Sequence, residues 1–559
     1  MKLDVKARTA AQVLVDQLVI QGVRHVFCVP GESYLPVLDA LVDRDIAITV
    51  CRQEGGAAIM AEAVGKATGR PGVCFVTRGP GAANAAHGVH IAQQSSSPMI
   101  LFVGQVDRSA RGRDAWQELD YAAVFGSMTK WAGEVDDPSR MSELVSRAFH
   151  AATAGRPGPV VLALPHDVLT EPVNCLDAPP HQAVETSPGA PEMAQLKALL
   201  AEATSPIVLL GGSRWDEAAR EAVTRFAERF ELPVVTGFRR LPLFDPLHPN
   251  YAGDLGIGPN PAMLARVEAA DLVLSIGGRL SDVTTQGYTL FELPTPKTKL
   301  VHVFPAPEEL GRIWRPHLAI NATPSRFAAA LEALAPPAAP AWRGTAAAAH
   351  AAYLAWSEVA TPQPGAVNLG EIMVWLREHL PADAILTNGA GNFAAWVGRF
   401  YRVRRFGGHI APNSGSMGYG VPAAVAMQRL YPERRVVAIS GDGDFLMNGQ
   451  EFATAVQYDL PIVVLVCDNA SYGTIRMHQE RDYPGRIVAT ELKNPDFAVY
   501  ARAFGGFGVT VERTADFGPA FDAAVASGQP SILHVKFDTD AISPSQTLTE
   551  IRAKALSRT

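Results

Sequence analysis

The chain is poor in cysteine and has no apolar run long enough to cross a membrane. Its five cysteines are scattered, without CxxC spacing, and most lie inside or beside apolar runs: Cys28, Cys51, Cys74, Cys175 and Cys467. Such cysteines are typical of small buried side chains in a reducing compartment. The N-terminal stretch lacks the long apolar core of a signal peptide, so we expect a cytoplasmic protein that binds no membrane.

The sequence also lacks a basic block, and its formal net charge is -7. This balance argues against nucleic acid as a partner. Of the 559 residues, 48% are hydrophobic and 19% are charged, which is typical of an ordinary soluble globular protein. The length suggests three or four domains, there is no short-period repeat, and a cytoplasmic enzyme is the simplest class.

Two segments without periodicity divide the chain. Residues 171–192 are rich in proline and polar residues, and residues 335–366 combine proline-rich ends with an alanine-rich stretch, so both are expected to be linkers. In the rest of the chain, short apolar runs alternate with helical patterns, which favours α/β folds with doubly wound parallel sheets. We therefore expect three such α/β domains, at residues 1–175, 190–335 and 365–559.

The most informative stretch is SGDGDFLMNGQEFAT, at residues 440–454. An apolar run ends at the GDG tripeptide around Asp442, a helical pattern follows, and a second apolar run ends at Asp468-Asn469. Strand, helix and strand within about 30 residues form a βαβ unit, in which both strands point the same way. The side chains of Asp442 and Asn469 should therefore meet at the carboxyl edge of a sheet, where such folds bind ligands.

The oxygen atoms in this arrangement suit a hard cation such as Mg2+, which also binds cofactor or substrate phosphates. Glycines beside Asp442 allow the backbone to approach a diphosphate closely. Taken alone, a GDG tripeptide is more often a tight turn whose aspartate caps a helix. The complete arrangement, from the GDG tripeptide to Asn469, instead favours a binding site for Mg2+ and a diphosphate.

This region resembles the metal–diphosphate motif of thiamine diphosphate (ThDP) enzymes, which begins with GDG and ends near NN; here it reads GDGDFLMNGQEFATAVQYDLPIVVLVCDNASYG. Asp468 stands where the family has its first Asn. The resemblance implies that Mg2+ is bound by the side chains of Asp442 and Asn469 and by the backbone carbonyl of Ser471. It also implies further ThDP contacts within the motif, at Gly441, Gly443, Asp444, Tyr472 and Gly473. The three domains would then be the pyrimidine-binding, central and diphosphate-binding domains of the family.

In the first domain, an apolar run ends at Arg52-Gln53-Glu54, and a helix rich in small residues follows. Without further information, an acid such as Glu54 at the start of a helix is explained by its favourable interaction with the helix dipole. The segment closely resembles acetolactate synthase; it reads RQEGGAAIMAEAVGKATGRPGVCFVTRGPGAAN. The resemblance implies that Glu54 binds the aminopyrimidine ring of ThDP and assists removal of the thiazolium proton. In the family this glutamate and the diphosphate site belong to different subunits, which implies a homodimer with active sites at the subunit interface, or a homotetramer.

Further positions follow from the same resemblance. The turn PGESYLPVLDAL places Pro30 at the cofactor and Glu32 where pyruvate decarboxylases have a catalytic aspartate, whereas acetolactate synthases have a small residue there. An acid at a helix N-terminus needs no function, so both interpretations of Glu32 stay open. Trp116 and Gln117 stand where acetolactate synthases have a Phe-Gln pair bordering the site, although an aromatic residue there could equally be core.

The third domain contains a Gly-x-Gly-x-x-Ala turn after an apolar run, which formally fits a dinucleotide-binding fingerprint. That fingerprint needs an acidic residue about 20 positions later, and none occurs between Asp383 and Glu433. In ThDP enzymes the same turn touches the diphosphate, here through Gly391 and Asn392. Met417, in the stretch NSGSMGYGVPAA, would be the bulky residue beneath the bent cofactor, although a methionine is ordinarily core filler.

The chain also departs from the family in the predicted substrate wall and at the flavin site. His478 stands where acetolactate synthases have a tryptophan, and Ile475 where pyruvate decarboxylases have a glutamate. The resemblance implies that His478 faces the substrate, although alone it would be an ordinary surface or core histidine. Of the residues that hold FAD in acetolactate synthases, Arg156 and Arg279 persist, but the acidic pair and the second arginine do not. We therefore expect no tightly bound FAD.

The sequence thus predicts a ThDP- and Mg2+-dependent carbon–carbon lyase/ligase similar to acetolactate synthase. Such a transferase or lyase decarboxylates a small 2-oxo acid such as pyruvate and ligates the product to a carbonyl acceptor. A non-ligating 2-oxo acid decarboxylase and a hydroxyketone lyase are alternatives within the family. A nicotinamide or flavin dehydrogenase would need the missing acid, and a non-catalytic ThDP binder would turn over no 2-oxo acid. The predicted catalytic residues are Glu54, Glu32, Gln117 and His478.

Overall fold

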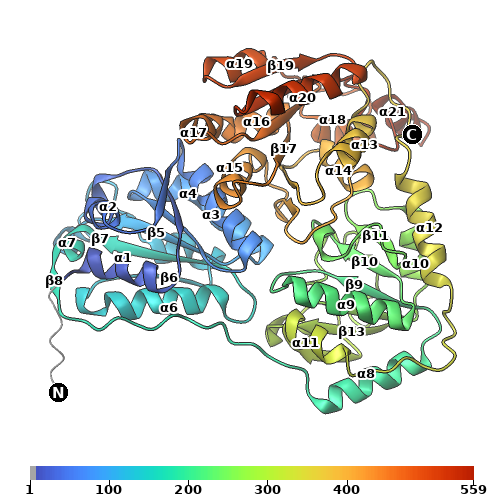
Figure 1. Ribbon diagram of the computed structural model, residues 1–559, viewed down its shortest axis with the longest axis horizontal. Helices are drawn as coiled ribbons and strands as arrows, with labels where there is room; N and C mark the ends of the chain where they lie inside the picture. The colour runs from blue at the N-terminus through green and yellow to red at the C-terminus, as the bar shows by residue number, and fades with distance from the viewer. Residues whose placement is uncertain (1–7, 559) are drawn as a thin grey trace. The chain divides into compact units, whose positions relative to one another are not determined.

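The structure, a computed structural model, describes residues 8–558. In this part of the chain three parallel sheets have six strands each, and helices flank every sheet (Figure 1). The predicted fold class, three doubly wound parallel-sheet domains, is confirmed. The chain forms two compact units: the first comprises the chain up to Val184 together with Val421–Pro432 and Asn448–Leu460, and the second comprises the remainder.

The first sheet lies in the first unit and has the strand order β3-β2-β4-β5-β7-β6. Its parallel strands are β2 (His25–Cys28), β3 (Ala47–Val50), β4 (Gly72–Val76), β5 (Met99–Gln105), β6 (Trp131–Glu134) and β7 (Pro159–Pro165). Helices α1 (Ala10–Ile20) and α6 (Met141–Thr153) pack together on one face, and α3 (Glu54–Thr68) and α4 (Gly79–Ser95) pack together on the other (Figure 1). The shorter helices are α2 (Leu35–Val42), α5 (Tyr121–Phe125) and α7 (His166–Thr170).

The second sheet lies in the second unit and has the order β11-β10-β9-β12-β13-β14, which is the strand order of dinucleotide-binding folds. Its strands are β9 (Pro206–Leu210), β10 (Val234–Gly237), β11 (Tyr251–Leu255), β12 (Leu272–Ile276), β13 (Lys299–Phe304) and β14 (Leu318–Asn321). Helices α8 (Ala190–Glu202), α9 (Glu217–Phe230) and α11 (Pro324–Leu331) contribute to the core on one face. Helices α10 (Pro261–Glu268) and α12 (Thr345–Ser357) contribute to the core on the other.

The third sheet, also in the second unit, has the order β16-β15-β17-β18-β20-β19. Its strands are β15 (Ile385–Asn388), β16 (His409–Ile410), β17 (Val436–Gly441), β18 (Val463–Asp468), β19 (Phe507–Val511) and β20 (Ser531–Lys536). Its helices are α13 (Leu369–His379), α14 (Phe393–Phe400), α15 (Gly420–Leu430), α16 (Asp442–Asn448), α17 (Phe452–Gln457), α18 (Gly473–Asp482), α19 (Phe497–Ala503), α20 (Phe517–Ser527) and α21 (Leu548–Leu556). The third sheet has the same topology as the first: its first strand along the chain lies between the second and the third. The chain therefore builds the sheet in one direction from β15 to β16 and in the opposite direction from β17 onward, so the direction of winding reverses between β15 and β17.

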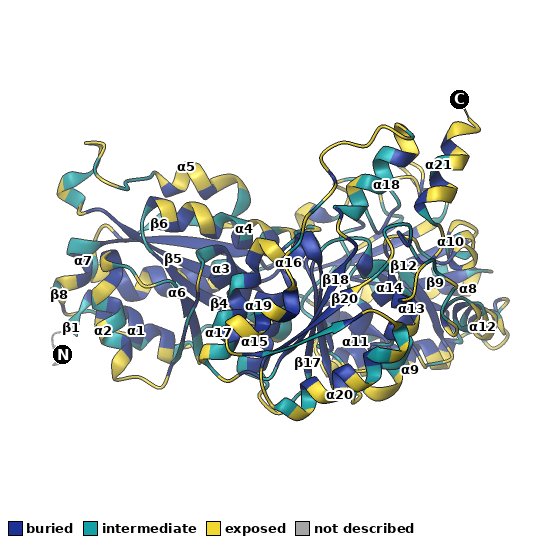
Figure 2. Cartoon of the chain, turned by 90° about the horizontal axis from the view of Figure 1, so that it is seen from above, coloured by how far each residue is buried: buried dark blue, intermediate teal, exposed yellow. Residues whose placement is uncertain are grey.

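The central strands of the sheets are buried along their whole length, and most of the exposed residues lie on helices and loops (Figure 2). Strands β5, β7, β9, β12, β17 and β18 contain only buried residues. Strands covered on both faces have continuous apolar sequences instead of alternating ones. This burial explains why the apolar runs of the sequence identify these strands.

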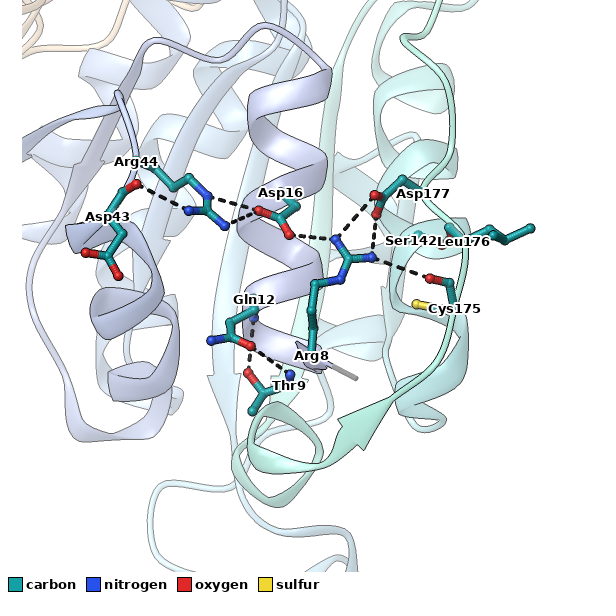
Figure 3. A network of polar contacts seen from close by, with 10 residues as sticks. All are labelled: Arg8, Thr9, Gln12, Asp16, Asp43, Arg44, Ser142, Cys175, Leu176 and Asp177. Atoms are coloured by element: carbon teal, nitrogen blue, oxygen red, sulfur yellow. Dashed lines mark hydrogen bonds and ion pairs between the residues drawn. The ribbon is translucent and has the colours of Figure 1, made fainter. Parts of the chain in front are cut away.

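A polar network fixes the start of the first unit (Figure 3). The guanidinium of Arg8, in β1 (Arg8–Thr9), lies 2.6 Å from Oδ2 of Asp16 and 2.8 Å from Oδ1 of Asp177. Asp16, on α1, also binds Arg44 at 2.6 Å. Strand β1 pairs antiparallel with β8 (Pro172–Val173). The network therefore joins the first helix to the segment that leaves the first sheet, although ion pairs this exposed contribute only about 0–1 kcal/mol each.

No helix within residues 8–558 combines the length and the apolar character needed to cross a membrane. All five cysteines are free thiols. Four of them are buried and Cys175 is half-buried.

Candidate active site

Three chain segments meet at the carboxyl edge of the third sheet, where the winding reverses. They follow β15, β17 and β18, which are parallel neighbours in the sheet. Loops begin at Gly389 and Asn469, after β15 and β18, whereas α16 begins directly after β17, at Asp442. Because open α/β sheets bind ligands at such reversal points, this edge is the principal candidate site of the second unit.

Asp442 is the central acid of this edge. Its Oδ2 accepts hydrogen bonds from the backbone N–H of Ser471, at 3.2 Å, and from the side-chain amide of Asn494, at 2.8 Å. The side chain is buried, and this burial raises the pKa of Asp442 to about 6, with the negative charge of Asp468 acting in the same direction. A bound divalent cation would reverse this effect and stabilise the ionised carboxylate.

Asp468, at the position of the first family asparagine, has its own partners. Its Oδ2 lies 2.7 Å from Nε2 of His534, and its Oδ1 accepts from Nδ2 of Asn494 at 2.8 Å. Burial alone would raise the pKa of Asp468, but the hydrogen bonds from His534, the backbone of Ala470 and Asn494 outweigh it and lower the pKa. Asn494 therefore bridges the two acids Asp442 and Asp468. We did not predict His534 or Asn494, because no local sequence pattern marks either of them.

Asp444 holds two neighbouring loops in place. Its Oδ1 accepts hydrogen bonds from the backbone N–H groups of Gly418, at 2.8 Å, and Ala390, at 3.2 Å. A Cβ on Gly389 would lie 2.0 Å from this oxygen, so only glycine fits there. Burial raises the pKa of Asp444 to about 6. The side chain thus shapes the loop after β15 and the turn that carries Met417.

These loops enclose a cavity of about 240 Å³, which we call the strand-end cavity. Every cofactor residue predicted in the third domain lines it: Gly391, Asn392, Met417, Gly441, Asp442, Gly443, Asp444, Asn469, Ser471, Tyr472 and Gly473. A Cβ on Gly443 would lie 2.5 Å from the ring of Tyr472, so a glycine is required for the backbone to lie against this ring. The cavity therefore combines oxygen donors with closely approaching backbone, as a metal-bound diphosphate requires.

Glu54 is placed separately, in the first unit, at the first position of α3. Its Oε2 accepts a hydrogen bond of 2.9 Å from Nδ2 of Asn84, on the adjacent helix α4. The two helices pack closely, because a Cβ on Gly88 would lie 2.5 Å from the Cβ of Ala58. This helix pair fixes both the start of α3 and the side chain that orients Glu54.

Glu451 fixes the loop that leads to Glu54, and sequence reasoning missed it. Its Oε1 accepts hydrogen bonds from the backbone N–H groups of Arg52, at 3.0 Å, and Gln53, at 2.9 Å. Its Oε2 accepts from the hydroxyl of Thr454 at 2.6 Å. The carboxylate is buried, and burial raises its pKa. The stretch GQEFAT contains this glutamate, but nothing in it indicates contact with a segment of the first domain.

The remaining predicted residues of the first domain occupy more open positions. The carboxylate of Glu32 is 63% exposed and lies 2.9 Å from Nη1 of Arg78. Pro30, two residues earlier, is exposed as well. Gln117 has a φ of 66°, and its buried Oε1 has no hydrogen-bond partner in the described chain, whereas Trp116 is 75% exposed. The roles of Pro30, Glu32 and Gln117 stay predictions.

His478 lies on α18 and lines a second cavity of the second unit, of about 420 Å³. Its Nδ1 is buried and has no hydrogen-bond partner among residues 8–558. An imidazole placed in this way is available to a ligand, which agrees with the predicted position in a substrate wall but does not test it.

Models of three protein domains match this chain. They are the "Thiamine pyrophosphate enzyme, N-terminal TPP binding domain" over residues 8–124, the "central domain" over residues 193–334 and the "C-terminal TPP binding domain" over residues 389–535. The C-terminal match contains the strand-end cavity loops, and the N-terminal match contains Glu54. The chain belongs to the thiamine pyrophosphate enzyme family.

Relatives with similarity over nearly the whole chain are acetolactate synthases. The acetolactate synthase large subunit of Parasynechococcus marenigrum (strain WH8102) is 32% identical over 548 residues, with 94% of this chain and 87% of the relative covered. The acetolactate synthase isozyme 2 large subunit of Escherichia coli (strain K12) is 32% identical over 537 residues, with 94% and 95% covered. The probable acetolactate synthase large subunit of Methanocaldococcus jannaschii is 30% identical over 545 residues, with 94% and 92% covered. Within its family, the chain is thus an acetolactate synthase-like, ThDP-dependent enzyme.

The contacts of Glu451 yield a testable prediction. Glu451→Ala leaves the part-buried amides of Arg52 and Gln53 without their acceptor, at a cost of up to about 1–3 kcal/mol for each. Hydrogen exchange, followed by mass spectrometry, should become faster in peptides covering residues 50–56. The exposed Glu433 supplies a control, since Glu433→Ala should leave this exchange unchanged. Equal exchange rates in wild type and Glu451→Ala would show that the carboxylate does not hold the loop.

Proposed function

We propose that the chain decarboxylates a small 2-oxo acid, such as pyruvate, and ligates the remaining fragment to a carbonyl acceptor, with ThDP and Mg2+ as cofactors. The observation that carries this proposal is the convergence of Asp442, Asn469 and Ser471 on one cavity of a chain that belongs to the ThDP family. The similar proteins are named as acetolactate synthases. A nicotinamide dehydrogenase would not account for this cluster.

The residues of the strand-end cavity suit the proposed cofactors. One carboxylate, one carboxamide and one backbone carbonyl provide oxygen ligands for Mg2+, whose other ligands would be phosphate oxygens and water. The raised pKa of Asp442 supports a cation at this place, because burial of the carboxylate needs a compensating positive charge. When bound, ThDP supplies the thiazolium ring that accepts the electrons released by decarboxylation. The protein supplies orientation and proton transfer.

Glu54 is our candidate for the proton-transfer group of the first unit. The hydrogen bond from Asn84 leaves the other carboxyl oxygen available for a ring nitrogen of the aminopyrimidine. In the family this glutamate acts on the cofactor of another subunit, so we propose a homodimer, or a homotetramer, with active sites at the subunit interface. Gln117, Glu32 and His478 are proposed to border the substrate.

Two further assignments belong to this proposal. Arg156 donates to Ser96 at 2.9 Å, and Arg279 lies 3.6 Å from Glu309, so both arginines that persist from the flavin site have protein partners. This supports an enzyme that works without FAD. The free cysteines support a reducing compartment, and we propose the cytoplasm.

A second candidate, decarboxylation without ligation, rests on His478. This residue replaces the tryptophan of acetolactate synthases, and it lines a cavity with an imidazole instead of a broad apolar ring. A change in the wall of the substrate pocket can change which carbonyl acceptor enters, or can exclude acceptors altogether.

A substrate screen distinguishes these functions. Purified protein with ThDP and Mg2+, and without added FAD, should release CO2 from at least one 2-oxo acid of a panel and form a ligated hydroxyketone product. Its spectrum should have no band near 450 nm. Aldehyde as the sole product would establish the non-ligating alternative, and no CO2 from any acid would refute the proposed function.

Loss of the metal ligand should abolish cofactor binding. In Asp442→Ala a hard anionic ligand is removed, so calorimetric ThDP affinity in the presence of Mg2+ should fall by about 100-fold or more, while the fold survives. The exposed Asp522 provides the matched control, and Asp522→Ala should bind ThDP as wild type does. Unchanged affinity in Asp442→Ala would overturn the metal site.

Replacement of the proposed acid should affect proton transfer more than binding. Glu54→Gln keeps the shape of the side chain and its contact with Asn84 but cannot supply the carboxyl proton. Exchange of the thiazolium proton, followed by NMR, should slow by about 10²–10⁴-fold, the usual range for a positioned acid–base group, while ThDP affinity changes little. Wild-type exchange rates in this variant would exclude the assigned role.

A further inference from the structure

The second unit contains a second cavity beside the strand-end cavity. It has a volume of about 420 Å³ and is lined by the loops after β10 and β11 and by helices α12, α14 and α18. The two cavities share lining residues, among them Gly391, Asn392 and Thr474, so they adjoin each other. The volume lies within the range of ordinary small-molecule sites. We call it the Arg239 cavity, after its principal charged residue.

Arg239 has no ion-pair partner within 4.0 Å among residues 8–558, and the charge of Asp444 acts on it from farther away. Its Nη2 donates a hydrogen bond of 3.1 Å to the carbonyl oxygen of Gly389. Burial lowers the pKa of Arg239 to about 10, partly offset by the charge of Asp444, so the guanidinium remains charged at neutral pH. Its backbone has a φ of 60°, an unfavourable conformation for a side chain of this size.

Arg239 is half-buried, and a charge that is partly removed from water without a close ion-pair partner is costly, so a bound anion can provide that partner. The guanidinium can form two parallel hydrogen bonds with a carboxylate, which makes it well suited to this task. The bound carbonyl of Gly389 belongs to the loop after β15 that also borders the strand-end cavity. Arg239 therefore stands next to the place where the cofactor would bind.

Two titratable groups of the Arg239 cavity bear on an acidic ligand. His478 presents a buried Nδ1 that has no partner in the described chain. Asp254, in β11, receives no side-chain hydrogen bond from residues 8–558, and burial raises its pKa to about 7. A carboxyl group with this pKa is about half protonated at pH 7, so its negative charge is reduced there. The cavity thus combines a cation and a histidine with one partly neutralised acid.

The remaining walls are mainly apolar. They are formed by Phe238, Ile257, Tyr353 and Trp356, and Arg399 stacks at 3.5 Å on the ring of Trp356. Apolar walls with a few polar groups suit a carbon chain that ends in a charged group. A short 2-oxo acid would leave most of this volume empty.

We propose that the Arg239 cavity binds the distal carboxylate of a dicarboxylic substrate, whose 2-oxo end reacts at the cofactor and whose second carboxylate pairs with Arg239. This inference rests on the proposed function and adds to it the substrate class. His478 is the second donor to the bound acid. The substrate is accordingly longer than pyruvate and carries two acid groups.

The test uses glutarate, a dicarboxylate that lacks the reacting oxo group, titrated by calorimetry into the full-length protein loaded with ThDP and Mg2+. Glutarate should bind, and butyrate, with one carboxylate, should bind more weakly. Arg239→Met should weaken glutarate binding by about 10- to 100-fold, as expected for loss of a charged hydrogen-bonded pair, and Arg239→Lys should weaken it less. The exposed Arg405 is the control, and Arg405→Met should match wild type.

Several results would overturn the inference. They are no binding of glutarate to wild type, equal glutarate affinity in Arg239→Met, or a loss of ThDP affinity in Arg239→Met without a change for glutarate. The last result would assign the guanidinium to the cofactor diphosphate. Arg239→Lys preserves the charge, so it keeps the test valid if Arg239→Met unfolds, which circular dichroism would reveal.

Turnover separates this inference from the proposed function. With 2-oxoglutarate and 2-oxopentanoate, which have equal chain length, the ratio of kcat/KM should favour the dicarboxylate in wild type and fall in Arg239→Met. Turnover of 2-oxo acids without glutarate binding would overturn the inference alone. Arg239-dependent glutarate binding without turnover of any 2-oxo acid would support the cavity and refute the proposed function.

Discussion

Parallel pairing of β15, β17 and β18 is the constraint on which the candidate site depends. Parallel strands bring their carboxyl ends to the same edge of a sheet, so loops far apart in the chain become neighbours there. The edge is also the place where winding reverses, which leaves a space that helices do not cover. The strand-end cavity and the Arg239 cavity both border the loop after β15, so the same strand end would serve the proposed cofactor and the second carboxylate that we assign to the Arg239 cavity.

Buried acids hold this edge and the Glu54 loop in place. Asp444 binds backbone amides of two loops, Glu451 binds two amides ahead of Glu54, and Asp442 faces the strand-end cavity. Burial raises the pKa of each of these acids, and the hydrogen bonds that each accepts act in the opposite direction. Asp444 and Glu451 each accept two backbone N–H groups from other segments on one oxygen, whereas Asp442 lies with Asn469 and Ser471 on the strand-end cavity. This difference separates positioning residues from the proposed metal ligand.

Sequence reasoning succeeded where the determining signals are local. Continuous apolar runs identified strands such as β17 and β18, and the GDG tripeptide with Asn469 indicated the loops that meet at the sheet edge. It failed where a contact joins distant segments: Glu451 and Arg52 are 399 residues apart, and Arg239 and Gly389 are 150 apart. Such pairs depend on how whole elements pack, and neither periodicity nor spacing encodes them. His534 and Asn494 were missed for the same reason.

The path of the chain through its two units has a consequence for inheritance. The chain leaves the first unit after Val184, returns for Val421–Pro432, leaves again, and returns for Asn448–Leu460. The first unit therefore borrows most of α15 and all of α17 from the segments that flank Asp442. A gene fragment that encoded only the part up to Val184 would produce a unit without two of its helices. Recombination at a single point cannot exchange this unit between relatives, so the loop with Glu54 and the diphosphate motif must be inherited together.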